Sequence, residues 1–89
     1  METKMETSYV FDVRVKNISV SYGIRHDRYS AVHLCAAAVA GKDGAVGFVY
    51  RGTKMLDRIE PDPCDPHRVI LVKADGQRVM FIPSPPDDI

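Results

Sequence analysis

The sequence predicts an α+β fold in which an antiparallel sheet of four to six strands carries one helix on one face. Segments of alternating apolar and polar residues lie on both sides of a single Ala-rich segment with helical spacing. Near the C-terminus, two apolar runs flank Asp75-Gly76, a dipeptide typical of tight hairpin turns. The expected order is β-β-α-β-(β)-β-β, one helix layer on one sheet layer.

The length and the charge of the chain exclude several classes of protein. The chain has 89 residues, which suits one domain over residues 9–83, between a flexible leader (1–8) and a flexible tail (84–89). Lys+Arg and Asp+Glu number 12 each, so the chain lacks the basic excess of a typical nucleic-acid binder. The apolar runs are too short to span a membrane, and the N-terminal residues lack the apolar core of a signal peptide. We therefore expect a cytoplasmic protein in which Cys35 and Cys64 are reduced thiols.

The first strand segment, Tyr9 to Tyr22, changes phase halfway. Its apolar residues fall first on odd and then on even positions: Phe11, Val13 and Val15, then Ile18, Val20 and Tyr22. One straight strand would expose one of these sets to water. A hairpin turning at Lys16-Asn17 would place all six on one face, in the pairs Val15–Ile18, Val13–Val20 and Phe11–Tyr22. A bulge in one long strand is the alternative.

The helix is predicted from Arg28 to Ala40, with Asp27 or Ser30 as N-cap and Gly41 as its stop. Three- and four-residue spacing defines the face expected to pack on the sheet, which comprises Tyr29, Val32, Cys35, Ala36 and Val39. A smaller apolar stripe lies nearly opposite and comprises Ala31, Leu34 and Ala38.

The middle of the chain is less regular. Ala45 to Arg51 predicts a strand, whereas Lys54 to Glu60 suits a short edge strand and a helical turn equally. Pro61 to Pro66 is interpreted as a connector, because its prolines exclude pairing in a central strand.

The predicted final hairpin, Arg68 to Pro83, decides how the rest of the chain must pack. If Asp75 and Gly76 form the turn, the cross-strand pairs are Val72–Val79, Leu71–Met80, Ile70–Phe81 and Val69–Ile82. Both faces are then apolar, and one helix covers only one of them. Four uncovered side chains would forfeit roughly 6–12 kcal/mol of burial. Either the strands at 46–50 and 54–59 fold over the second face, or another chain does, most simply a second copy. The expected core or dimer-contact residues are Val69, Leu71, Met80, Ile82, Leu34 and Ala38.

Two charged segments are candidate partner-binding sites. Arg25, His26 and Arg28 precede or open the helix, whose N-terminus favours a phosphate or carboxylate. The alternative is a solvated loop in which Asp27 caps the helix. The acidic residues Asp57, Glu60, Asp62 and Asp65 could contact a basic partner, or could form a solvated loop.

Metal binding and catalysis are not expected. Cys64-x-x-His67 has the spacing of a zinc ligand pair, and His33-x-Cys35 could supply two more ligands. However, residues two apart on a helix point roughly 160° apart, so His33 and Cys35 should not converge on one ion. The sequence has no nucleophile elbow, P-loop or H-E-x-x-H motif. We predict no cofactor and no enzymatic activity.

The closing V-I-L and Arg78-Val79-Met80-Phe81-Ile82-Pro83 pattern, after an N-terminal hairpin and an Ala-rich helix, resembles small bacteriophage anti-CRISPR proteins that inhibit type I systems. The resemblance covers about half of the chain, and the segment from Ala45 to His67 is additional. It implies a non-enzymatic inhibitor that acts in a bacterial host cell by binding a CRISPR surveillance complex or its nuclease, and that blocks target-DNA access or recruitment. It transfers no functional residue. The sequence thus predicts a protein-binding module that forms a homodimer. The alternatives are a self-associating accessory domain without inhibitory role, and an anion or nucleic-acid binder acting through the basic segment.

Overall fold

A computed structural model describes residues 8–83, so the predicted tail and all but Ser8 of the predicted leader lie outside the described residues. The elements are β1 (Tyr9–Val15), β2 (Ile18–Arg25), α1 (Arg28–Val39), β3 (Ala45–Arg51), β4 (Lys54–Asp62), β5 (Asp65–Lys73) and β6 (Arg78–Phe81). The predicted α+β class, with one helix and an antiparallel sheet, is confirmed.

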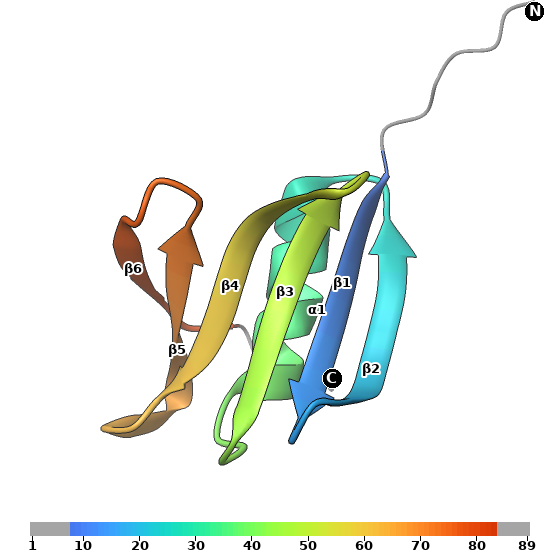
Figure 1. Cartoon of the computed structure of the whole chain (residues 1–89). Coiled ribbons are helices and arrows are strands. Elements are labelled where there is room, and N and C mark those ends of the chain that lie inside the picture. Colours follow the sequence, from blue (N-terminus) through green and yellow to red (C-terminus); the bar gives the residue numbers. More distant parts are fainter. Residues whose placement is uncertain (1–7, 84–89) are drawn as a thin grey trace, which may run out of the picture.

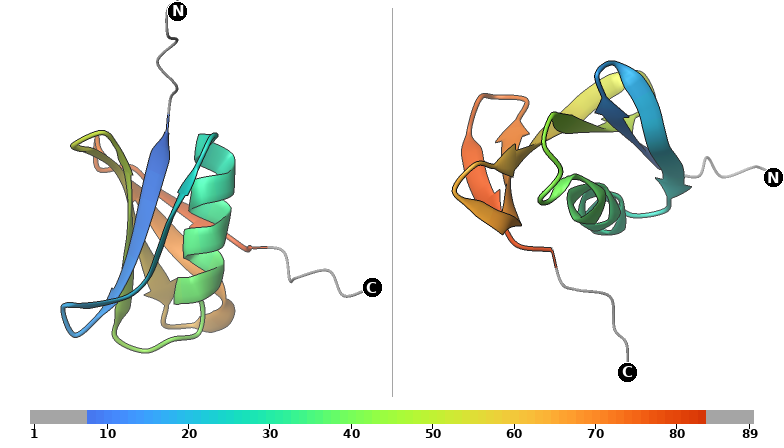
Figure 2. Two further views of the ribbon diagram at one scale, coloured as in Figure 1. Left: turned by 90° about the vertical axis from the view of Figure 1, so that its right-hand side faces the viewer. Right: turned by 90° about the horizontal axis from the view of Figure 1, so that it is seen from below.

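All strands join one antiparallel sheet in the order β2-β1-β3-β4-β5-β6 (Figure 1). The sheet curves around α1, which lies in its concave side (Figure 2). β3 and β4 occupy the middle of the sheet, so the alternative in which residues 46–50 and 54–59 fold over the second face of the final hairpin is wrong. We call the face toward α1 the inner face and the opposite one the outer face.

The predicted hairpin of β1 and β2 is confirmed and the alternative of one long strand is wrong, although a bulge does occur within β2. Lys16 and Asn17 form the predicted turn, with φ of 54° and 68°, as a tight two-residue hairpin requires. The register then shifts, because Val13 pairs with Ser21 while Arg14 pairs with Ser19, which leaves Val20 as a bulge.

This bulge overturns two predicted pairs. Val20 does not face Val13, and Tyr22 pairs with Asp12 rather than with Phe11. Gly23 takes the place opposite Phe11, and a Cβ there would lie 3.0 Å from two carbons of the Phe11 ring. The ring therefore packs over a position without a side chain, and Tyr22 turns to the outer face.

The helix begins and ends within one residue of its predicted bounds. Asp27 is the N-cap, and its carboxylate accepts hydrogen bonds from the Ser30 main-chain N (3.3 Å) and Oγ (3.2 Å). The buried residues of α1 are Ala31, Val32, Cys35, Ala36 and Val39. Two expectations are thus wrong, since Tyr29 is exposed and Ala31 is fully buried. Leu34 and Ala38 are partly buried against the core.

The segment with two open interpretations, Lys54 to Glu60, is a strand, and β4 runs on through Pro61 to Asp62. The predicted Pro-rich connector is wrong, because Pro61 and Pro66 lie within β4 and β5. Pairing between β3 and β4 stops at Gly47–Ile59. Pro61 therefore lies beyond the part of β3 that pairs with β4, where a missing N–H breaks no ladder on that side.

The last hairpin has a different register from the predicted one. The Lys73 carbonyl accepts from Gly76 N (2.8 Å), and Lys73 N donates to the Gln77 carbonyl (2.8 Å), which makes a three-residue loop with Gly76 at φ 92°. Val69 now pairs with Phe81, and Leu71 with Val79. Shifting the register by one residue moves every β6 side chain to the other face.

The inner face of this hairpin is therefore Val69, Leu71, Val79 and Phe81, and not the predicted set. Val69 and Leu71 are buried, whereas Met80 and Ile82 are exposed and do not belong to the core of the chain. The core lies between α1 and the inner face, where Val13, Val49 and Ile59 are fully buried. In the described residues, no helix is long and apolar enough to cross a membrane.

Candidate functional site

The structure does not gather Arg25, His26 and Arg28 into one anion site. The Arg28 guanidinium donates to Asp57 through Nε (3.2 Å to Oδ2) and Nη2 (3.1 Å to Oδ1). Arg25 Nη1 donates to the Ile24 carbonyl at 2.7 Å. The two arginines of this segment therefore have different partners, and His26 lies exposed between them in the chain.

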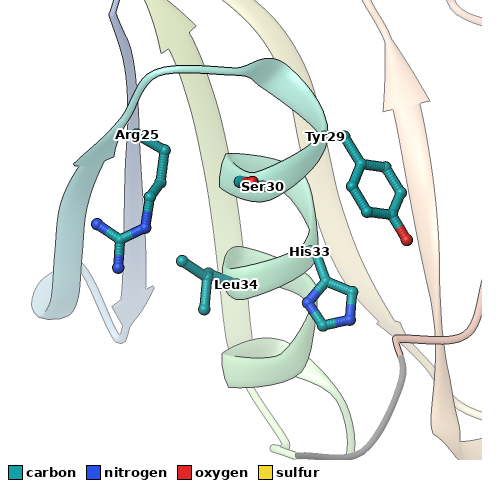
Figure 3. Close-up of a pocket in the computed structure, with 5 residues that line it drawn as sticks. All are labelled: Arg25, Tyr29, Ser30, His33 and Leu34. Carbon is teal, nitrogen blue, oxygen red and sulfur yellow. The ribbon is translucent and has the colours of Figure 1, made fainter.

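Arg25 instead borders a hollow of about 390 Å³ on the solvent side of α1, together with Tyr29, Ser30, His33 and Leu34 (Figure 3). In Figure 3, Arg25 and Leu34 lie on one side of the helix and the Tyr29 and His33 rings on the other. The Tyr29 and His33 rings are 5.9 Å apart and reach Phe81 of β6 at 6.4 and 6.3 Å. These rings connect the helix to the far hairpin, which is a structural role.

The acidic residues point to different parts of the molecule. Asp57, with 1% of its side chain exposed, lies on the inner face and pairs with Arg28 and with Lys73 Nζ at 3.8 Å. Glu60 lies on the outer face, between Arg58 (3.1 Å) and Arg78 (3.8 Å). The two carboxylates are thus on opposite sides of the sheet and cannot contact one partner surface together.

The other two acidic residues stabilise the tip of the hairpin between β4 and β5. Asp62 accepts from Cys64 N (2.8 Å) and Arg68 Nε (2.6 Å), and these two bonds hold the pKa of its carboxyl below the ordinary value. Asp65 accepts from His67 N at 2.9 Å. The predicted acidic stretch is thus divided among local turns and ion pairs.

The two cysteines are free. Burial beneath the helix raises the pKa of the Cys35 thiol to about 12, so it stays protonated at neutral pH and is unsuited to nucleophilic or metal-binding roles. Over residues 8–83, no three His, Cys, Asp or Glu side chains gather closely enough to hold a metal ion.

The strongest candidate surface is the outer face, on which Glu60 and Met80 lie among the predicted site residues. We call it the open face, because no described segment lies over it (Figures 1 and 2). The register places on it apolar residues from five strands, namely Val10, Val46, Phe48, Tyr50, Met55, Ile70, Val72 and Met80. The Phe48 and Tyr50 rings lie 6.3 Å apart near its middle.

The open face is also hollowed on its β2 side. A depression of about 550 Å³ there is lined by Val10, Asp12, Arg14, Ser19, Tyr22, Tyr50, Gly52 and Thr53. Asp12 accepts from Ser19 Oγ (2.6 Å) and Arg14 Nε (2.9 Å). This charged group lies beside exposed Tyr22 and half-buried Tyr50, so aromatic and polar groups alternate in the hollow.

Strand β3 differs most between its two faces. Beneath the helix its inner face has the small residues Ala45 and Gly47, followed by Val49, while its outer residues are Val46, Phe48 and Tyr50. A Cβ on Gly47 would overlap Cys35 Sγ, which shows how closely α1 approaches. The sequence A-V-G-F-V-Y already shows that the small and the bulky residues lie on opposite faces of the strand. Only the position of β3 in the sheet reveals which of these faces the helix covers.

No protein-family model matches the chain, and searches of curated proteins and of solved structures found no similar protein. Any functional assignment therefore depends on the surfaces of the chain itself. Of these, the open face combines aromatic residues, a hollow and paired charges.

Proposed function

We propose that this chain is a non-enzymatic protein-binding module whose contact surface is the open face. One observation carries the proposal: β3 places its bulky Phe48 and Tyr50 on the uncovered face and its small Ala45 and Gly47 under the helix. A sheet with one solvated face normally alternates apolar with polar residues. Here the outer positions of β3, and of β5 with Ile70 and Val72, are apolar.

The arrangement of charges on the open face supports the same proposal. Ion pairs flank the apolar centre, with Asp12–Arg14 on one side and Glu60 with Arg58 and Arg78 on the other. Protein interfaces commonly have an aromatic or apolar centre, a polar rim and an enrichment in arginine. Full burial of a Phe or Val side chain contributes about 1.5–3 kcal/mol, so a partner covering the centre would gain several such terms.

The anion-binding alternative has less support. Its three residues do not converge, and Arg28 already neutralises a buried carboxylate. An anion would have to compete with Asp57 for that guanidinium. In the accessory-domain alternative, the contact surface serves only self-association. This alternative requires the same apolar surface as our proposal, but its partner is a second copy of the chain and not a different protein.

The partner implied by the sequence resemblance is a type I CRISPR complex, and it gives the proposal a specific test. Target-DNA binding by a purified type I complex would be measured with wild-type chain, with Tyr50→Lys on the open face, and with Tyr29→Lys on the helix as control. We expect wild type and the control to reduce DNA binding, and Tyr50→Lys to act at least about tenfold more weakly, which corresponds to about 1.4 kcal/mol. Unchanged DNA affinity, together with no binding of the wild-type chain to the purified complex or to its nuclease, would exclude this partner.

A second experiment tests the surface without assuming the partner. The three proteins would be immobilised and exposed to nuclease-treated bacterial lysate. Proteins retained by wild type and Tyr29→Lys but released by Tyr50→Lys would support the open face as a contact surface. Equal retention by all three, with Tyr50→Lys shown to be folded by circular dichroism, would contradict it.

A further inference from the structure

The two edge strands of the sheet, β2 and β6, differ in how well they are protected against pairing with a strand of another chain. β2 is eight residues long, and four large apolar side chains along it are exposed, namely Ile18, Val20, Tyr22 and Ile24. Its only charged residue is Arg25 at its end. β6 has only four residues, begins with Arg78 and is followed by Pro83. Proteins usually protect edge strands by shortness, charge or proline, and β6 has these features while β2 lacks them.

The bulge at Val20 is the one protective feature of β2, and it affects only the end near the hairpin turn. From Ser21 to Arg25 the strand keeps regular register with β1, ending in the pair Tyr9–Arg25. Five consecutive residues of β2 therefore form a regular edge. Figure 1 shows this edge at the margin of the sheet, with no described segment beside it.

The register of β1 and β2 determines which main-chain N–H and C=O groups of β2 point away from the sheet. In a two-residue hairpin, the residues flanking the turn exchange both main-chain hydrogen bonds, and bonded pairs then alternate along the strands. Counting from Val15–Ile18 along β1, the pairs Asp12–Tyr22 and Val10–Ile24 are the non-bonded kind. The N–H and C=O groups of Tyr22 and Ile24 thus point away from β1, toward an incoming strand.

We propose that a second copy of this chain adds its β2 antiparallel to this edge, with Gly23 opposite Gly23 of the partner subunit. Tyr22 then lies opposite Ile24 of the partner subunit on both sides of a twofold axis perpendicular to the sheet. Such aromatic and β-branched pairs stabilise adjacent strands.

Three features favour a second copy as the occupant. An extended strand in antiparallel register satisfies the outward N–H and C=O groups of Tyr22 and Ile24 together, as an exposed sheet edge favours. The regular part of β2 is uncharged up to Arg25, so antiparallel self-pairing sets no like charges opposite each other; Arg25 meets Ser21 of the partner subunit. A twofold axis makes one strand serve both sides of the contact, as in most homodimers.

The dimer has a consequence for the open face. A twofold axis perpendicular to the sheet keeps both outer faces on the same side, so two open faces join into one continuous surface across twelve strands, six from each copy. The inference concerns the edge and not the face, so it goes beyond the proposed function and does not depend on it. Because few residues pair, we expect a concentration-dependent dimer with a dissociation constant in the micromolar range.

Sedimentation equilibrium of the full chain over a wide concentration range tests this, with two matched variants. Ile24→Lys and Met80→Lys place the same charge on equally exposed residues, 56% and 59%, of the two opposite edges. We expect wild type and Met80→Lys to dimerise with similar affinity, and Ile24→Lys to dimerise at least about tenfold more weakly. A wild type that is monomeric at every concentration overturns the proposal, and so does a loss of association in Met80→Lys, which would indicate head-to-tail pairing of β2 with β6.

The register is tested by cross-linking in a Cys64→Ser background, since Cys64 is exposed. Ser21 and Arg25 of different copies would form a non-bonded pair with Cα atoms about 4.5 Å apart, close enough for a disulfide. A mixture of Ser21→Cys and Arg25→Cys chains should form a mixed disulfide under mild oxidation, and neither chain alone should cross-link. Efficient cross-linking of either chain alone overturns this register. Tyr50→Lys should dimerise with the affinity of wild type. The proposal of a dimer through β2 and the proposal of partner binding through the open face can therefore be refuted independently.

Discussion

The two faces of this sheet are built from similar residues and differ in what covers them. On the inner face, Val13, Val49, Ile59 and Val69 are fully buried under α1. On the outer face, Phe48, Tyr50 and Val72 are only half-buried; the Phe48 and Tyr50 rings are neighbours, and Arg58 lies between Phe48 and Val72 in the register. The inner face therefore supplies most of the stability of the chain, while the outer face retains apolar surface that folding of one copy does not bury.

The largest expected difference is between two isoleucines on adjacent strands. Ile59→Ala on the inner face should lower the free energy of unfolding by about 2–5 kcal/mol, because it leaves a cavity in a fully buried site. Ile70→Ala on the outer face should cost only about 1 kcal/mol, because Ile70 is already partly solvated. Urea denaturation of both variants measures the two values. Equal losses would mean that the outer face is buried in the folded state, and the comparison would fail.

The next difference is between two arginines, one for each face. Arg28→Met removes both hydrogen bonds from buried Asp57 and leaves it Lys73 at 3.8 Å, so we expect a loss of about 1.5–3 kcal/mol. Arg58→Met breaks an exposed pair with Glu60 and should cost less than about 1 kcal/mol. The Arg28→Met loss should shrink in an Asp57→Asn background, because a neutral amide needs no counter-charge. A loss that is unchanged there would show that Arg28 acts through packing and not through the ion pair.

The elements of the fold were predictable from local sequence, and their register was not. Alternation, the Asp27 cap and the Lys16-Asn17 turn predicted the turn of the first hairpin and the bounds of the helix nearly to the residue, because each signal acts within a few positions. The second strand of that hairpin runs on to Arg25, three residues past its predicted end. Asp75-Gly76 was ambiguous, since it fits a two-residue turn and also the last two positions of a three-residue loop. The loop is one residue longer than predicted, so the register shifts and Met80, which was expected in the core or at a dimer contact, is exposed on the outer face.

The candidate site was harder to predict, because it depends on the order of strands. The pair Arg28–Asp57 joins residues 29 positions apart, and no local pattern links them. The bulge at Val20, which exposes Tyr22, could not be read from the sequence. The switch of apolar residues from odd to even positions is explained equally well by a hairpin without a bulge. The outer residues of β3 were visible as an apolar set, but their exposure follows from the position of the strand in the middle of an uncovered sheet.

The smallest expected effect concerns the charge at the edge of the open face. Burial acts to raise the pKa of the Asp12 carboxyl, but the hydrogen bonds from Ser19 and Arg14 outweigh it and lower that pKa below its ordinary value. A carboxyl with a lower pKa in the folded state adds stability above its unfolded pKa of about 3.9, and this stability is lost as pH falls through the folded pKa. Asp12→Asn should therefore be less stable than wild type at pH 7, by less than about 1 kcal/mol, and the difference should disappear in acid. Thermal denaturation of both proteins from neutral to acid pH measures the difference. Ser19→Ala should reproduce part of it, because it removes one of the two donors, whereas a difference that persists below the folded pKa would assign the effect to packing in the hollow of the open face.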